Sequence, residues 1–233
     1  MKKDPYVTVE NFRLSGSEIM NLAKLIHSTL YDTYPSLTKL ITYLKNMNKL
    51  LMKLNLNIGI VWKTPSGLIL EQKYMEMKSD TITISILGKR KSFNLSKTTN
   101  KISLRRQNNS IVPNLIHSMD AANISLLVNS LIEDNKKLNL VTIHDCFATD
   151  ANHVEFINLK VRAAFLQLYQ NQTFINDFHN FIINHLINLG INIIDNNKIE
   201  LSNKKIIDIP IKPDFSNSLD LKYNLFNSPY FIN

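Results

Sequence analysis

The spacing of apolar residues changes once along this chain, and this change restricts the fold more than any other feature of the sequence. Up to Leu54, apolar side chains recur every three or four positions on both sides of Pro35, which predicts two consecutive helices. From Ile58 onward, short apolar runs alternate with turn-forming residues, which is typical of strands. We therefore expect an α+β fold in which helices pack on an antiparallel sheet and one basic β-hairpin protrudes.

Turn chemistry locates two hairpins after residue 57, and the apolar pattern indicates a third. Residues 64–67 read Thr-Pro-Ser-Gly, in which proline presets φ and glycine permits positive φ, so this turn joins strands expected at 58–62 and 68–74. Gly88 ends a run of β-branched and polar residues and predicts a longer ribbon. A third hairpin is expected where two apolar runs flank His144-Asp145-Cys146.

Helical spacing returns in the second half of the chain. Apolar positions between Asn114 and Leu131 predict a helix that begins at Pro113, because proline is favoured in the first helical turn. Two more helices are expected at about 152–170 and 173–189, the second ended by Gly190. These elements predict one folded unit with three parts: a helical segment (1–56), the strands and hairpins (57–150) and a helical C-terminal part (151–233).

Positive charge is concentrated in one segment. The formal net charge is +8, and no acidic residue lies between Asp80 and Asp120. The Lys and Arg side chains of this segment could displace counterions from a nucleic acid backbone, or they could belong to a solvated basic loop. They are Lys89, Arg90, Lys91, Lys97, Lys101, Arg105 and Arg106.

Composition narrows the remaining classes of protein. A single Cys excludes an internal disulfide framework and a zinc site of four Cys or His ligands at the usual spacing. The N-terminus lacks the apolar core of a signal peptide, and no stretch of about 20 apolar residues predicts a membrane span. Asn and Ile each number about 30 whereas Gly numbers 5, a bias that indicates AT-rich coding DNA of an organelle, a plasmid or an AT-rich microbe.

A carboxylate at the third hairpin is the main candidate for chemistry. Asp145, preceded by His144 and flanked by apolar strands, would suit Mg²⁺, because a sheet can hold a hard oxygen ligand in a fixed position. An Asp in a turn can equally cap the turn, and His117 and His144 can be ordinary half-buried histidines. Cys146 is expected to be a small buried hydrophobe.

Three ordered motifs together resemble the C-terminal part of the single-subunit, bacteriophage-type RNA polymerases. These motifs are Trp62–Gly67 with Gln72 and Tyr74, Pro113–Asp120, and Ile143–Phe147. The resemblance covers about residues 16–233 and includes the ending Leu219-Asp220-Leu221 and Ser228–Phe231. Mitochondrial RNA polymerases and the polymerases of mitochondrial linear plasmids belong to this family. Family A DNA polymerases also carry His-Asp in a palm hairpin, but Glu normally follows, and here Cys146 does.

The resemblance implies a palm-like sheet and roles for several residues. Asp145 would be one of two aspartates that hold two Mg²⁺ ions during nucleotidyl transfer, and His117 would lie near the growing RNA end. The ribbon from about Thr81 to Lys101 lies where the family carries its promoter-specificity hairpin, with Arg105, Arg106 and Gln107 in the adjoining stretch. The implied partners are a DNA template and promoter, nascent RNA and ribonucleoside triphosphates, with no membrane, and the implied location is the mitochondrion.

Other family motifs do not occur in these 233 residues. Asp4, Asp32 and Asp80 lack the surroundings of motif A, which carries the second aspartate, and the Tyr-Gly pair of the fingers helix, motif B, is missing. We therefore expect the isolated chain to be inactive without an upstream polymerase fragment, and the apolar face of the helix before Pro35 to be exposed in it. Three hypotheses remain: part of a working RNA polymerase, an inactive remnant, or a nucleic-acid-binding module without catalysis.

Overall fold

The computed structural model describes residues 6–9, 12–86, 88–134, 138–170, 173–194, 198–201, 204, 206–215 and 221–229. Contacts between residues divide the chain into two compact units, 1–42 and 43–233. The first unit contains a hairpin of β1 (Tyr6–Val9) and β2 (Phe12–Ser15), then α1 (Gly16–Thr33) and the start of α2 (Pro35–Lys53). The predicted pair of helices on either side of Pro35 is thus confirmed.

Helix α1 begins with a capping box. The Ser15 hydroxyl accepts a hydrogen bond from the Glu18 backbone N–H, and the Glu18 carboxylate accepts one from the Ser15 backbone N–H at 2.7 Å. No side chain of α1 is buried, and Leu25 and Ile26 are 62% and 60% exposed. The apolar face of this helix is therefore exposed, as the sequence predicts.

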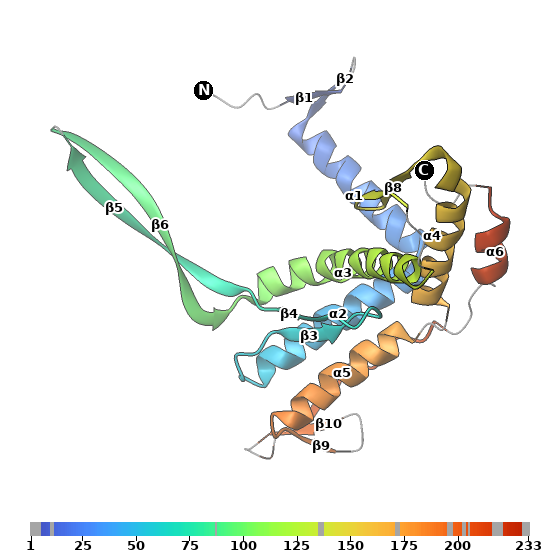
Figure 1. Ribbon diagram of the computed structural model, residues 1–233. Helices are drawn as coiled ribbons and strands as arrows, with labels where there is room; N and C mark the ends of the chain where they lie inside the picture. Colours follow the sequence, from blue (N-terminus) through green and yellow to red (C-terminus); the bar gives the residue numbers. More distant parts are fainter. Residues whose placement is uncertain are drawn as a thin grey trace. The chain divides into compact units, whose positions relative to one another are not determined.

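The second unit continues with the remaining elements in chain order (Figure 1). The first half contains β3 (Ile60–Lys63), β4 (Ile69–Gln72), β5 (Met75–Ile86), β6 (Lys89–Ile102), α3 (Leu104–Glu133), β7 (Leu140–Ile143) and β8 (Cys146–Thr149). The second half contains a 3₁₀ turn (Ala151–His153), α4 (Val154–Tyr169), α5 (Phe174–Asn188), β9 (Asn192–Ile194), β10 (Lys198–Glu200), β11 (Ile206–Asp208) and α6 (Leu221–Asn227).

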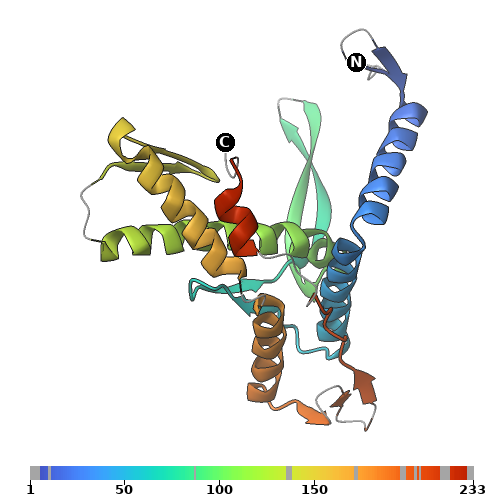
Figure 2. The same ribbon diagram turned by 90° about the vertical axis from the view of Figure 1, so that its right-hand side faces the viewer.

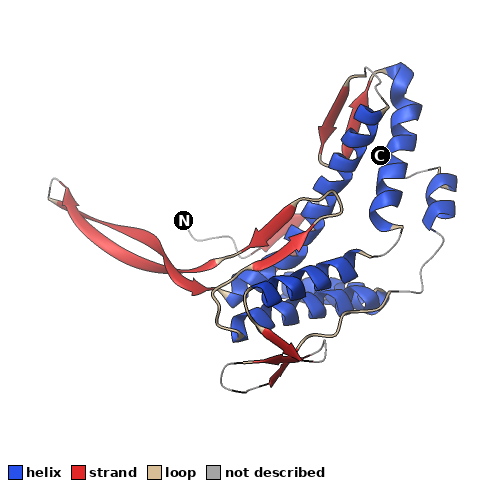
Figure 3. Ribbon diagram, turned by 60° about the horizontal axis from the view of Figure 1, so that its bottom comes forward, coloured by secondary structure: helices blue, strands red, loops and turns tan. Residues whose placement is uncertain are grey.

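The described strands form small antiparallel sheets (Figure 3). β1–β2, β3–β4, β5–β6 and β7–β8 are two-stranded hairpins, and β9, β10 and β11 form a three-stranded sheet in the order β11–β10–β9. The α+β class and the three predicted hairpins are confirmed, although the described strands do not join into one sheet. The sequence does not predict β9–β11, because each of these strands has three residues and no clear alternation.

Helix α3 begins nine residues earlier than the sequence predicts. Ser103 caps it by accepting a hydrogen bond from the Arg106 N–H at 3.4 Å, and Pro113 lies inside the helix rather than at its start. The expectation was wrong because a proline in a long helix removes one hydrogen-bond donor, whereas packing on both sides of it holds the remaining turns. Ile111 and Leu115 flank Pro113 and are both buried.

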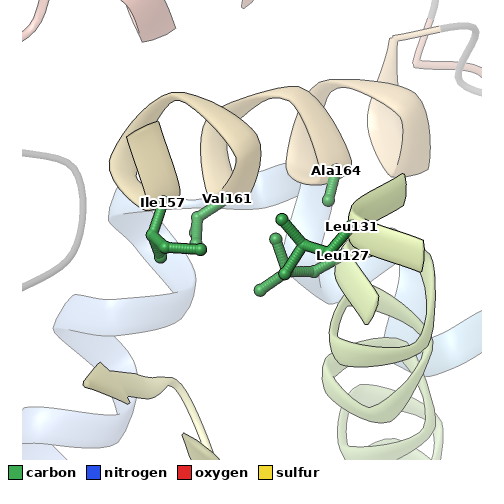
Figure 4. Packing of buried hydrophobic residues seen from close by; sticks show 5 residues of the cluster. All are labelled: Leu127, Leu131, Ile157, Val161 and Ala164. Atoms are coloured by element: carbon green, nitrogen blue, oxygen red, sulfur yellow. The ribbon is translucent and has the colours of Figure 1, made fainter. Parts of the chain in front are cut away.

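The C-terminal half of α3 packs against α4. Leu127 and Leu131 of α3 point toward Ile157, Val161 and Ala164 of α4, and all five side chains are buried (Figure 4). Figure 2 shows α4 crossing α3 in this region, with the β7–β8 hairpin beside it. Leu140 and Phe147 of this hairpin pack against the same cluster. The cluster therefore fixes the third hairpin onto two helices.

A second contact region joins α2, β3 and α5. Phe178 of α5 contacts the rings of Tyr43 and Trp62, at centroid distances of 6.3 and 6.4 Å. The Tyr43 hydroxyl lies 2.9 Å from Nδ1 of His179. Burial raises the pKa of Tyr43, and burial together with the nearby Lys212 charge lowers the pKa of His179. Gly190, with φ of 81°, ends the α5 segment as predicted.

The C-terminal segment is held by a buried arginine. Arg162 of α4 donates hydrogen bonds to the carbonyl oxygens of Leu225 and Ser228, the second at 3.0 Å, and to the Asn158 side chain at 2.7 Å. Leu219, Asp220, Tyr230 and Phe231 of the terminal motif lie outside the described residues. By length and composition alone α3 could cross a membrane, and a third of its most apolar window is buried within this protein.

Replacement of Leu127 by Ala should destabilise the second unit. Leu127 is fully buried in the α3–α4 cluster, so the substitution leaves a cavity and should lower the free energy of unfolding by about 2–5 kcal/mol. Urea denaturation followed by circular dichroism measures this. Leu25→Ala on the exposed α1 is the control and should change it by less than about 0.5 kcal/mol. Equal effects of the two substitutions would contradict the assigned core.

Acid should destabilise the α2–α5 contact. Because the pKa of His179 is lowered in the folded state, the unfolded chain takes up the proton first, and stability is lost as the pH falls from about 6.5 through the lowered value. His179→Gln should reduce this loss between pH 7 and pH 5, as measured by urea denaturation at each pH. An identical pH profile for both proteins would exclude His179 as the cause.

Candidate active-site residues and nucleic-acid interface

The β7–β8 hairpin places Asp145 at its tip. Ile143 pairs with Cys146, so the turn consists of two residues, His144 and Asp145. His144 has φ of 53°, a left-handed conformation that suits the first position of a tight hairpin turn but costs a residue other than glycine about 1–2 kcal/mol. Cys146 belongs to the strand and is exposed, so the expectation of a buried cysteine was wrong. Neighbouring side chains of a strand point to opposite faces, so the Cys146 side chain points away from the core on which Phe147 packs.

The Asp145 carboxylate is free while its backbone is fixed. Asp145 is exposed, and among the described residues its side chain has no hydrogen-bond or ion-pair partner. Leu140 and Phe147 fix the hairpin through the α3–α4 cluster. An exposed carboxylate on a rigid turn can act as an oxygen ligand for a hard cation.

The described residues do not complete a metal site. Nowhere in the described part of the chain do three or more His, Cys, Asp or Glu side chains gather closely enough to hold a metal ion. A centre with two Mg²⁺ ions needs several oxygen ligands in fixed positions, and Asp145 offers one carboxylate. The donor set of the described residues therefore does not fit two metals by itself, and no reaction step through a metal can be derived from it.

His117 lies at a separate, open pocket of about 460 Å³ between the β3–β4 hairpin and α3. Its lining includes apolar Leu68 and Leu70 together with the polar side chains of Asn114, His117 and Tyr74. His117 is exposed at this pocket, one helical turn after Asn114. A mixed apolar and hydrogen-bonding lining suits a base or sugar better than a free ion.

A hydrogen-bond network fixes the wall of this pocket. Gln72 and Gln107 exchange hydrogen bonds with each other through side chains and backbone at 2.9–3.0 Å. Asn114 Nδ2 donates to the Gln72 side chain at 2.9 Å and to the Tyr74 hydroxyl at 3.2 Å. Gly59 lies against the Gln72 backbone, where a Cβ atom would come within 2.5 Å of the Gln72 carbonyl oxygen. These partners explain why the motif contains Gln72 and Tyr74, whereas Gly59 carries no recognisable signal in the sequence.

The described contacts do not bring His117 and Asp145 together. His117 lies in the half of α3 beside β3–β4, while the Asp145 hairpin packs at Leu127 and Leu131. The ten residues from position 117 to 127 extend about 15 Å along a helix. The structure thus holds two separate candidate sites on one helix.

The ribbon β5–β6 has two chemically different faces. The pairing places Ile82 opposite Phe93, Ile84 opposite Lys91 and Ile86 opposite Lys89, so these residues share a face. The other face pairs Ser85 with Arg90, Thr83 with Ser92 and Thr81 with Asn94. The ribbon is therefore apolar with flanking lysines on one face, and rich in hydroxyl groups on the other.

The predicted basic residues are distributed over this ribbon and the start of α3. Lys89, Lys91 and Lys97 lie on the apolar face. On this face Lys97 pairs with Lys78, which the predicted set does not include because it precedes Asp80 and so lies outside the acid-free segment. Arg90 lies on the hydroxyl face, and Lys101 at the base of the ribbon. Arg105 and Arg106 are exposed in the first turn of α3. The Arg106 guanidinium lies over the Tyr74 ring, with its Cζ 5.2 Å from the ring centroid, and donates a hydrogen bond to the Met75 carbonyl oxygen. All seven are exposed.

Comparison with known proteins agrees with these motifs. A family model for DNA-dependent RNA polymerase matches residues 6–211. The chain is 34% identical over 180 residues to a probable DNA-directed RNA polymerase of Neurospora crassa, covering 77% of this chain and 20% of the relative. It is 31% identical over 198 residues to one of Agaricus bitorquis, covering 84% and 18%. It is 29% identical over 127 residues to DNA-directed RNA polymerase 1, mitochondrial, of Arabidopsis thaliana, covering 54% and 12%.

The chain is much shorter than the relatives that it matches. It spans about a fifth of the length of the fungal relatives that it matches. The matched residues include the pocket with His117, the ribbon and the hairpin with Asp145. The chain belongs to the DNA-dependent RNA polymerase family, in its single-subunit, bacteriophage-type branch.

Proposed function

We propose that this chain forms the part of a DNA-directed RNA polymerase that contributes Asp145, the His117 pocket and the basic ribbon. The whole enzyme would transfer nucleotides from ribonucleoside triphosphates to RNA on a DNA template. The observation that carries the proposal is the hairpin tip, because His144 adopts positive φ there at a cost to folding, and the turn holds an exposed carboxylate that has no partner among the described residues and is useful for metal binding.

Asp145 would be one metal ligand, and the rest of the polymerase would supply the others. When bound, Mg²⁺ would stabilise negative charge at the reacting phosphate. His144 keeps the turn in its two-residue form and holds the carboxylate at the tip. The small sheets β3–β4 and β7–β8 would then be parts of a palm-like sheet, completed by strands from the remaining four-fifths of the enzyme.

The pocket and the ribbon would bind nucleic acid. His117, with Tyr74 and Asn114 beside it, would position the end of the product strand, since these groups offer a ring and hydrogen-bonding atoms at one open pocket. The ribbon would contact promoter DNA, with its lysines and arginines on phosphates. A mitochondrial location is supported by the AT-rich composition and by the mitochondrial relative of Arabidopsis thaliana.

A nucleic-acid-binding module without catalysis is the second candidate. It is favoured by the absence of a group of three metal-ligating side chains within the described residues, together with the charge of the ribbon. An inactive remnant of a polymerase would have the same geometry. The two experiments below separate DNA binding from catalysis.

Neutralising the ribbon should weaken DNA binding through its salt dependence. The test uses the full chain and a 30-base-pair duplex. Because each phosphate contact contributes about 0.9 to the steepness with which the logarithm of the binding constant K falls with log [salt], the triple variant Lys89→Gln/Arg90→Gln/Lys91→Gln should make this slope shallower by up to about 2.7. Fluorescence anisotropy at several salt concentrations measures the slope. Lys89→Arg/Lys91→Arg keeps the charge and should keep the slope. Equal slopes for wild type and the triple variant would contradict a role of the ribbon.

Removing the Asp145 charge should abolish nucleotidyl transfer. In an active polymerase that contains this chain, Asp145→Asn should lower RNA synthesis by about a thousand-fold or more, corresponding to about 4 kcal/mol of activation free energy. Incorporation of labelled ribonucleotides over a range of Mg²⁺ concentrations measures this.

The matched control is Asp208→Asn, on an exposed aspartate of β11, which should leave the rate unchanged. Synthesis by the Asp145 variant at the wild-type rate would exclude Asp145 as a metal ligand. DNA binding by both variants should match the wild type, so loss of binding would indicate a folding defect instead.

A further inference from the structure

Helix α2 carries a row of lysines on its exposed face. Lys45, Lys49 and Lys53 follow one another at intervals of four residues, and all three are exposed. The opposite face is buried through Leu44, Met47 and Leu51. The row lies in the second unit, outside the acid-free segment of the ribbon. We call these three residues the α2 lysine row.

Nothing in the surrounding sequence or the described contacts neutralises this row. No acidic residue occurs between Asp32 and Glu71. Among the described residues, Lys45, Lys49 and Lys53 have no ion-pair partner. Like charges four residues apart destabilise a helix. The row therefore presents a positive surface whose counter-charge must come from solvent ions or from a bound partner.

The row ends beside the base of the ribbon. A pocket of about 320 Å³ is lined by Met52 of α2, by Asn55 in the turn after α2, and by Asn100 and Lys101 of β6. Met52 follows Lys45 by seven residues and so lies on the same side of the helix. Glu76 also lines this pocket and is its one acidic side chain. The end of α2 thus lies beside the base of the ribbon, across a pocket of mixed apolar and polar lining that includes Lys101.

We propose that the α2 lysine row binds the sugar-phosphate backbone of a nucleic acid and extends the contact surface beyond the ribbon. Three lysines at four-residue spacing cover about 12 Å of helix, and a duplex strand carries a phosphate about every 3.4 Å of its axis, so each lysine can reach its own phosphate. Backbone binding needs no base recognition, which fits a row of flexible ammonium groups. This inference rests on the proposed nucleic-acid binding and adds a second, independent surface to it.

The test is the salt dependence of binding by the full chain. For a 30-base-pair duplex, the variant Lys45→Gln/Lys49→Gln/Lys53→Gln should make the negative slope of log K against log [salt] shallower by about 2–3. It should weaken binding equally for duplexes of different sequence. The matched control, Lys198→Gln/Lys204→Gln/Lys222→Gln, removes the same charge from exposed lysines of the C-terminal region. This control should keep the wild-type slope. Single-stranded DNA and single-stranded RNA as further probes identify the backbone that the row prefers.

The slopes measured for the α2 variant, the control and the ribbon variant show which of these surfaces contacts the nucleic acid. A shallower slope for the α2 variant but not for the control supports the proposal. An equally shallow slope for both variants would show a general charge effect and overturn the proposal. An unchanged slope for the α2 variant also overturns it, even when the ribbon variant loses binding, in which case the proposed function stands. No binding by the wild-type chain would overturn both. Matching thermal melts of all variants confirm that they fold.

Discussion

Burial of one side of α3 connects the two candidate sites. The thirty residues of this helix pack Ile111 and Leu115 near the β3–β4 pocket, and Leu127 and Leu131 against α4. His117 and the Asp145 hairpin therefore depend on the same rigid element, although none of the contacts among the described residues joins them. A displacement of this helix would therefore move both candidate sites together.

The sequence permits a good prediction of local structure because turn residues have direct physical causes. Pro65 and Gly67 locate the first hairpin, Gly88 the ribbon and Gly190 the end of the α5 segment, and each requirement concerns a single backbone position. Motif order predicts the family for a related reason, since His144-Asp145 between apolar strands combines a turn with two titratable side chains. Both kinds of signal are local in the chain.

Features that depend on packing or pairing are not visible in the sequence. In the sequence alone Pro113 indicates a helix start, and only the buried residues on both sides of it show that it lies inside the helix. Exposure of Cys146 follows from alternation relative to Phe147, and this requires knowing which neighbour faces the core. The division of the ribbon into an apolar and a hydroxyl face follows from strand register, which a one-residue shift would reverse. The roles of Asp145 and His117 stay predictions.

The left-handed conformation of His144 also bears on how this position can change over evolutionary time. Glycine and asparagine adopt positive φ at lower cost than histidine, so selection for hairpin stability alone would favour drift toward them. A histidine that remains there keeps the hairpin less stable than it could be. The histidine found here therefore gives up part of the stability that this backbone geometry offers to glycine or asparagine.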